Sequence, residues 1–139
     1  MYKIRFLPHT ADVRVRLEAG SQESLFRAAL SAMNRLLKKA GCKKNGRYEL
    51  DLPVLIEAKD ATVLLVDFLS EALSAAYTEK AVYCRIHFEE LTRTRLRATL
   101  SGRSVAAFDE DIKAVTYHEA EVVHDEKTGR WSTLVVFDI

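Results

Sequence analysis

The sequence predicts an α+β fold in which two long amphipathic helices pack on a largely antiparallel sheet. Two segments carry apolar residues at helical spacing, and the other apolar residues alternate with polar ones in short runs, as half-buried strands do. Most of these strands follow one another without a helix between them, which favours antiparallel pairing. The chain has 139 residues, a usual length for one domain, and contains no repeat or linker. We therefore expect a single domain over residues 1–139, with the element order ββαβαββββ.

Two strands and a helix are expected first. Apolar residues alternate with basic residues over 2–6 and alternate with arginines over 13–17, which predicts two strands. Apolar residues then recur at helical spacing over 22–39, and Ser21 precedes them as a favourable N-cap.

A third strand and a second helix follow. The even-numbered positions are apolar within 48–58, which predicts a strand, and Pro53 favours a sheet edge or a break there. An apolar stripe over 61–79, preceded by Asp60 as N-cap, predicts the second helix.

The rest of the chain is expected to form four strands. Alternation predicts strands over 82–88 and 96–100, then a loop over 102–112 that is rich in small and acidic residues. Two further strands, over 114–123 and 131–138, flank a turn-forming stretch.

The net charge of +1 conceals two oppositely charged halves. Residues 1–59 carry twelve basic and six acidic side chains, whereas residues 60–139 carry nine basic and fourteen acidic ones. Without an overall basic field there is no electrostatic argument for a protein that coats RNA. A basic and an acidic region suit a protein that docks another protein and holds a cation.

Composition also bears on location. No apolar run is long enough to span a membrane, and the first residues lack the apolar core of a signal peptide. Cys42 and Cys84 match no CxxC or zinc-ligand spacing, so we expect two unpaired thiols in a reducing compartment. These observations predict a soluble, cytoplasmic protein that does not contact membranes.

Three local features could carry chemistry, since Gly-rich phosphate loops, GxSxG elbows and HExxH motifs are absent from the sequence. Three other local features could carry chemistry. The first is the turn 9–12, whose Thr and Asp side chains could equally bond their own backbone. The second is the chain end, where Asp138 places a carboxylate beside the terminal carboxylate of Ile139. Such oxygens repel unless a cation lies between them, and Mg²⁺ and Ca²⁺ prefer these ligands. A frayed, solvated terminus is the alternative.

The third feature is the segment 111–118, an acidic loop that enters a strand. Alternation places Lys113 on one strand face and both Thr116 and His118 on the other. The second face is either a polar site or a solvated surface.

Two basic stretches lie outside these features. The segment 35–47 contains six basic and no acidic residues. It is typical of a solvated helix end, but it could also meet phosphates or an acidic protein face. Arg93, Arg95 and Arg97 alternate along one strand face and offer another route to nucleic-acid binding.

Together, the three local features resemble the archease family. The resemblance rests on His9-Thr10-Ala11-Asp12, on Lys113-Ala114-Val115-Thr116-Tyr117-His118 and on the terminal Asp138-Ile139, and it covers the whole chain. It implies a non-enzymatic accessory protein of the tRNA-splicing RNA ligase, which joins a 3′-phosphate or cyclic phosphate end to a 5′-hydroxyl with GTP and a divalent metal. The resemblance further implies that the protein promotes guanylylation of this ligase and permits its multiple turnover.

The resemblance also implies a metal site for Ca²⁺, Mg²⁺ or Mn²⁺. Its ligands would be Asp12, Asp138 and the Ile139 carboxylate. Candidates for partner activation or for support of the ligands are His9, Lys113, Thr116 and His118. The partner would be the ligase itself and contact with RNA would be indirect, while the oligomeric state is left open.

Two other functions stay open at this point. The chain could act by protein contact as a chaperone or modulator of a tRNA methyltransferase or another RNA-modifying enzyme. It could also be a small metal-dependent phosphohydrolase that uses Asp12, Asp138 and His118, although the sequence offers no clear activated nucleophile or general base.

Overall fold

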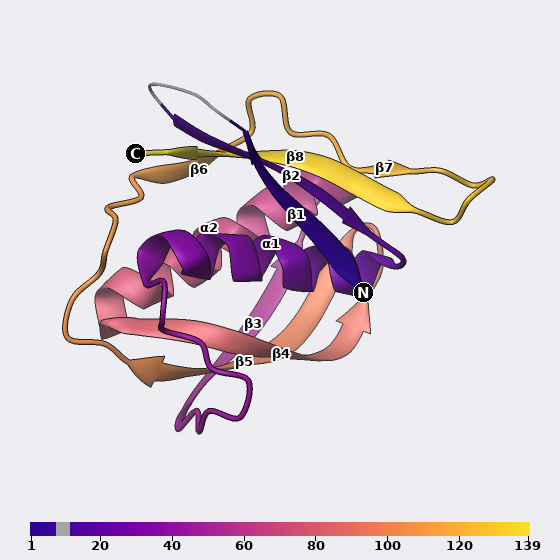
Figure 1. Cartoon of the computed structure of the whole chain (residues 1–139). Coiled ribbons are helices and arrows are strands. Elements are labelled where there is room, and N and C mark those ends of the chain that lie inside the picture. Colours follow the sequence, from indigo (N-terminus) through magenta and orange to yellow (C-terminus); the bar gives the residue numbers. More distant parts are fainter. Residues whose placement is uncertain (8–11) are drawn as a thin grey trace.

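A computed structural model describes residues 1–7 and 12–139 and confirms the α+β class (Figure 1). The elements are β1 (Tyr2–Leu7), β2 (Asp12–Ala19), α1 (Gln22–Leu37), β3 (Leu50–Glu57), α2 (Ala61–Glu79), β4 (Ala81–Leu91), β5 (Arg95–Ser104), β6 (Ala114–Thr116), β7 (Val123–His124) and β8 (Trp131–Asp138). The order agrees with the prediction except near 114–123, where two short strands replace one long strand.

The strands form two antiparallel sheets, and both helices lie between them (Figure 1). In the larger sheet the order is β1-β2-β8-β6, and β7 also pairs with β8; in the smaller sheet it is β3-β5-β4. Helix α1 contacts β2 on one side and β4 on the other, and α2 contacts β6, β3 and β4. Because β8 pairs with β2, from the other end of the chain, and with β6 across a loop, local patterns could not divide the strands between two sheets.

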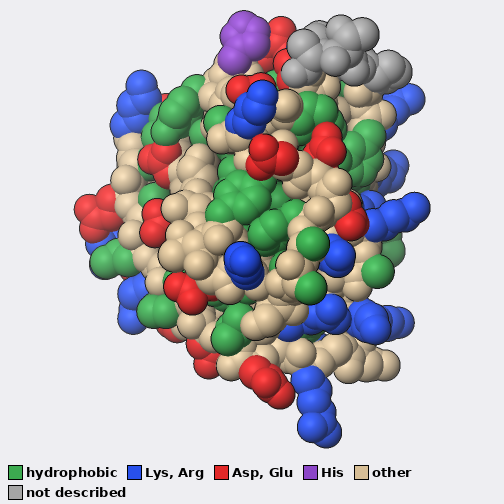
Figure 2. All heavy atoms as spheres, turned by 90° about the vertical axis from the view of Figure 1, so that its left-hand side faces the viewer, with side chains coloured by type: hydrophobic (Ala, Val, Ile, Leu, Met, Phe, Trp, Pro, Cys, Tyr) green, Lys and Arg blue, Asp and Glu red, His purple; other side chains and the backbone are tan. Residues whose placement is uncertain are grey.

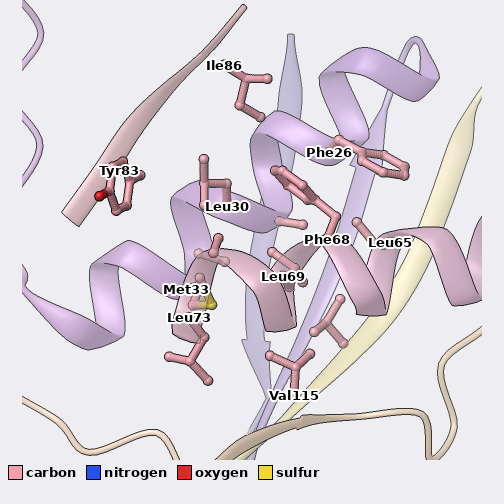
Figure 3. Packing of buried hydrophobic residues seen from close by; sticks show 14 of the residues in the cluster. Phe26, Leu30, Met33, Leu65, Phe68, Leu69, Leu73, Tyr83, Ile86 and Val115 are labelled. Atoms are coloured by element: carbon pink, nitrogen blue, oxygen red, sulfur yellow. The ribbon is translucent and has the colours of Figure 1, made fainter. Parts of the chain in front are cut away.

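Apolar side chains from both helices fill the space between the sheets (Figure 3). Phe26 and Leu30 of α1 meet Phe68 and Leu69 of α2, and the rings of Phe26 and Phe68 lie 5.7 Å apart. By length and composition alone α2 could cross a membrane, but half of its apolar window is buried inside this core. Truncating Phe68 to Ala would cost about 3–5 kcal/mol of stability.

The predicted caps and the predicted edge are confirmed. The Ser21 hydroxyl accepts a hydrogen bond from the Ser24 N–H, and Asp60 Oδ1 accepts one from the Val63 N–H. Both bonds satisfy donors that a helix leaves unpaired in its first turn. Pro53 lies in β3, an edge strand of the smaller sheet, where a missing N–H is tolerated.

The prediction of two unpaired thiols is wrong, because Cys42 and Cys84 form a disulfide. The segment after α1 folds back onto β4 and brings the two Cα atoms within 5.6 Å, although 42 residues separate them. Sequence spacing cannot reveal such a long-range approach. Closing a loop of this length stabilises the fold by about 4 kcal/mol in the chain-entropy account.

Candidate metal site at the chain end

The sheet brings the two predicted aspartates together. Asp12 begins β2 and Asp138 ends β8, and these residues are directly opposed in the antiparallel register. On the other side of β8, Ala114 of β6 is also opposite Asp138, and the Lys113 N–H donates to the Asp138 carbonyl at 2.7 Å. One row across three strands therefore contains Asp12 of β2, Asp138 of β8 and Ala114 of β6.

Both aspartate side chains belong to the outer face of the larger sheet. Val15 and Phe137 point into the core, so the even-numbered positions of β2 and β8 point away from it. Directly opposed residues have Cβ atoms about 4.5–5.5 Å apart, and like charges at such positions destabilise a sheet. Asp138 is exposed, whereas Oδ1 of Asp12 is buried. A cation shared by the two carboxylates would relieve their repulsion.

The third oxygen donor expected for the site is the terminal carboxylate of Ile139. The Ile139 side chain is half-buried and packs against the hydrophobic core, so the chain end is anchored rather than frayed. Three carboxylates of this kind suit a hard divalent cation. The described residues contain no group of three or more His, Cys, Asp or Glu side chains that could hold a metal, so the set depends on the main-chain carboxylate.

The other candidate residues lie at different distances from this row. Lys113 is exposed and adjoins Asp138 through its backbone. Thr116 ends β6 opposite Val136, and its hydroxyl oxygen is buried with no hydrogen-bond partner in the described part of the chain. Thr116 is therefore not part of a solvated surface. His9 lies outside the described residues.

His118 is not on the strand face where alternation placed it. The strand ends at Thr116, and a turn follows in which the Ala120 N–H donates to the Tyr117 carbonyl at 3.1 Å. His118 Nε2 lies 3.7 Å from Glu119 Oε1, and the His118 side chain is 78% exposed. Because it is a turn residue, its orientation could not follow the period of two.

Glu119 contacts residues of the candidate site, although the sequence did not indicate it. Its backbone adopts a left-handed conformation with φ of 60°, which is unfavourable for a residue other than glycine. Its Oε2 lies 2.5 Å from Arg14 Nη1, and Arg14 is two positions from Asp12 on the same face of β2. A continuous set of polar contacts thus leads from His118 through Glu119 to the strand that carries Asp12.

Two tyrosines, Tyr77 of α2 and Tyr117 of the turn after β6, hold the segments on either side of β6 in place. The Tyr117 hydroxyl donates to Asp67 Oδ1 of α2, and this bond raises the pKa of Tyr117 above its ordinary value. The Tyr77 hydroxyl accepts a hydrogen bond from the Ile112 N–H at 2.6 Å and donates one to the Ile112 carbonyl at 2.9 Å. Burial raises the pKa of Tyr77. These bonds fix the chain immediately before Lys113 and after Thr116.

Figure 2 shows the end of the molecule where the chain terminates. Acidic side chains gather there around an apolar patch, and basic side chains lie along the right-hand edge of the view.

Comparison with known proteins decides the family. The model of the Archease protein family (MTH1598/TM1083) matches residues 4–139. The chain belongs to the archease family. Among curated archeases, that of Methanosarcina mazei is 33% identical over 99% of this chain and 96% of its own length. The archease of Methanosarcina acetivorans is 32% identical with the same coverage.

Solved structures show the archease fold for this chain as well. A crystal structure from Thermotoga maritima, described as an archease and possible chaperone, aligns with a TM-score of 0.65 at 19% identity, covering 96% of this chain and 94% of that one. The solution structure of protein 1598 of Methanobacterium thermoautotrophicum aligns with a TM-score of 0.67 at 21% identity, covering 98% of both chains. At these identities the structures establish the fold alone.

Proposed function

We propose that this archease is a metal-binding accessory protein, not an enzyme, that activates the tRNA-splicing RNA ligase in tRNA splicing and RNA repair. It would promote GTP-dependent guanylylation of the ligase and allow multiple turnover. The observation that carries the proposal is the register of β2 and β8, which sets Asp12 directly opposite Asp138 beside the chain end. Family membership supports the same role.

The described residues suit presentation of a cation better than chemistry within this chain. Asp12, Asp138 and the Ile139 carboxylate would hold a Ca²⁺, Mg²⁺ or Mn²⁺ ion at an open sheet face. A bound divalent cation supplies positive charge to a nucleotide phosphate. The chain's own residues fix the ligands: the β6 backbone holds Asp138, and core packing holds Ile139. This role requires no contact between RNA and this chain.

Residues around the carboxylates are candidates for contact with the partner. Lys113 and His118 are exposed on either side of β6, and the buried Thr116 hydroxyl lies between them in sequence. Glu119 and Arg14 would hold the turn that presents His118.

The test is guanylylation of purified ligase with GTP and Mn²⁺ or Mg²⁺, followed as covalent incorporation of labelled nucleotide. Substoichiometric wild-type protein should accelerate incorporation, and Asp138→Ala or a C-terminal extension beyond Ile139 should abolish the acceleration. Asp125→Ala, in the exposed turn at the other end of β8, is the matched control and should behave as wild type. Equal stimulation by Asp138→Ala and wild type would rule out the proposed site.

A chaperone function is the second candidate, because a similar structure is described as a possible chaperone. The protein would then alter the solubility or specificity of an RNA-modifying enzyme such as a tRNA methyltransferase. A change in methyltransferase specificity with no effect on the ligase would favour this candidate. Phosphate release by the protein alone would favour a phosphohydrolase, but no described side-chain cluster joins His118 to the two aspartates.

A cytoplasmic location is part of the proposal, and the disulfide sets a condition on it. Disulfides are rare in reducing cytosol, although intracellular proteins of hyperthermophiles are rich in them. Rapid alkylation of thiols in intact cells would show whether Cys42 and Cys84 are bonded there; complete alkylation of both would show that the reduced form is the working form.

A further inference from the structure

A strongly basic groove lies on the side of the fold formed by α1, the segment after it and β4. Its volume is about 530 Å³, and seven cationic side chains and no carboxylate line it. Four of the cations are lysines between positions 38 and 44, and the other three are Arg27, Arg35 and Arg85. The groove contains most of the basic segment 35–47, which the proposed metal site does not use.

The charges of the groove are largely unneutralised. Asp109 lies 3.5 Å from Lys38 and accepts the Lys39 N–H, but among the described residues no carboxylate forms an ion pair with Lys43 or Lys44. Arg35 is likewise exposed and unpaired within residues 1–7 and 12–139. Cations in this state are free to bind an external anion without first breaking an ion pair.

The other basic stretch of the sequence is different. Arg95 pairs with Glu57 and Glu90, and Arg97 lies 3.7 Å from Glu89. Arg93 lies over the ring of Trp131, with 4.9 Å between its guanidinium carbon and the ring centre. Two of the three arginines expected to bind nucleic acid are therefore neutralised, unlike most cations of the groove.

Several bonds hold the lysine-bearing segment in place. The disulfide joins Cys42 to Cys84 of β4, and both residues line the groove. The Tyr48 hydroxyl accepts from the Lys43 N–H at 2.9 Å and donates to the Lys43 carbonyl at 2.7 Å.

The guanidinium of Arg85 completes this arrangement. It donates to the Gly46 carbonyl at 3.1 Å and covers the Tyr48 ring at 4.6 Å. A Cβ atom at position 46 would lie 2.9 Å from the Tyr48 hydroxyl, so a larger residue there would displace the Tyr48 ring. A segment fixed in this way loses little conformational entropy when it binds a ligand.

We propose that this groove binds the phosphodiester backbone of single-stranded RNA directly. Lysines at successive positions suit a chain of phosphates, whose binding is sequence-independent and dominated by charge. Tyr2 also lines the groove and is 37% exposed, so its ring offers a face on which a base can stack. An acidic peptide would not need that ring. The choice of RNA rests on the proposed function, and it replaces the expectation that RNA is contacted only through the ligase.

The test is fluorescence anisotropy of a labelled oligouridine strand with the protein alone, in the oxidised state and without ligase or added metal. If each of the four lysines contacts one phosphate, affinity should fall about 50-fold between about 50 and 200 mM salt. Lys43→Glu/Lys44→Glu should weaken binding about tenfold or more and halve the salt slope. Tyr2→Ala should weaken binding without changing that slope.

The matched control is Arg5→Glu/Arg16→Glu, which makes the same charge change on exposed strand residues outside the groove. It should bind like wild type at the higher salt concentration, and circular dichroism would verify the fold of both double variants. Reducing the disulfide should weaken binding severalfold.

Three results would overturn the proposal. One is equal loss of affinity in the two double variants, because binding would then follow net charge alone. Another is displacement of the strand by polyglutamate of matched charge at equal concentration, which would make the groove a site for acidic protein. The third is equally effective displacement by GTP, which would make it a nucleotide site. None of these outcomes affects guanylylation of the ligase, so the proposed function is tested separately.

Discussion

The opposed pair Asp12 and Asp138 makes a prediction whose sign depends on metal. Replacing Asp138 by Asn removes one of two like charges that the register places directly across β2 and β8. In the absence of divalent cations, the variant should therefore be more stable than wild type. In their presence the order should reverse, because the variant has lost one of the three proposed carboxylate ligands.

The magnitudes follow from the geometry. Two unit charges about 5 Å apart repel by about 1 kcal/mol in water and about 3 kcal/mol at an effective dielectric constant of 20. Asp138 is exposed, so the lower figure applies, which for 139 residues corresponds to about 3 °C in Tm. Metal at 100 times its Kd stabilises wild type by about 2.7 kcal/mol. Mutating a residue that only supports a metal ligand weakens metal affinity up to about 100-fold, and losing a direct ligand should weaken it at least as much. At the same metal concentration, the variant would then gain less than about 0.5 kcal/mol of stability from the metal.

The assay is thermal unfolding of both proteins in EDTA and in a saturating series of Mg²⁺ or Mn²⁺ concentrations. Asp51→Asn, on an exposed position of β3 in the other sheet, is the control for removing a carboxylate. It should respond to metal as wild type does. A variant less stable than wild type in EDTA, with an unchanged response to metal, would refute the electrostatic reasoning.

Three other predictions concern the supports of the site and groove. Cys84→Ser opens the bond to Cys42 and should lower the free energy of unfolding by about 4 kcal/mol, seen as a lower urea midpoint than that of oxidised wild type. Glu119→Gly should be more stable than Glu119→Ala by about 1 kcal/mol, because only the backbone conformation at φ 60° distinguishes the two; equal midpoints would contradict this. The Lys39 N–H bonded to Asp109 holds the pKa of that carboxyl below its usual value. The ionised Asp109 carboxylate therefore stabilises the fold above about pH 4, and this stabilisation is lost as pH falls through the lowered pKa. Below about pH 4 the stability of Asp109→Asn should consequently fall less steeply than that of wild type.

Local sequence patterns were sufficient for most of the fold. Side-chain caps act on neighbouring backbone groups, so Ser21 and Asp60 correctly marked the helix starts. The edge position of Pro53 followed from its missing N–H in the same way. The prediction that Asp12 approaches the final strand needed only that chain start and end share a sheet, which the register confirms.

The parts that failed depend on contacts between distant segments or on unusual backbone geometry. The pairing of Cys42 with Cys84 requires the chain after α1 to fold back onto β4, and no local period encodes that. The alternation through His118 was interrupted because Glu119 adopts a left-handed conformation in a turn, which its residue type disfavours. The neutralisation of Arg95 by acids on two neighbouring strands was likewise invisible in one strand's sequence.

The central claim is that carboxylates at the two ends of the chain jointly hold one divalent cation. Calorimetric titration of the metal-free protein with Mn²⁺ tests this most directly. We predict one site per chain in wild type, with binding weakened about 100-fold or more in both Asp12→Asn and Asp138→Asn. Equal affinity in wild type and both variants, or no binding by wild type, would contradict the account.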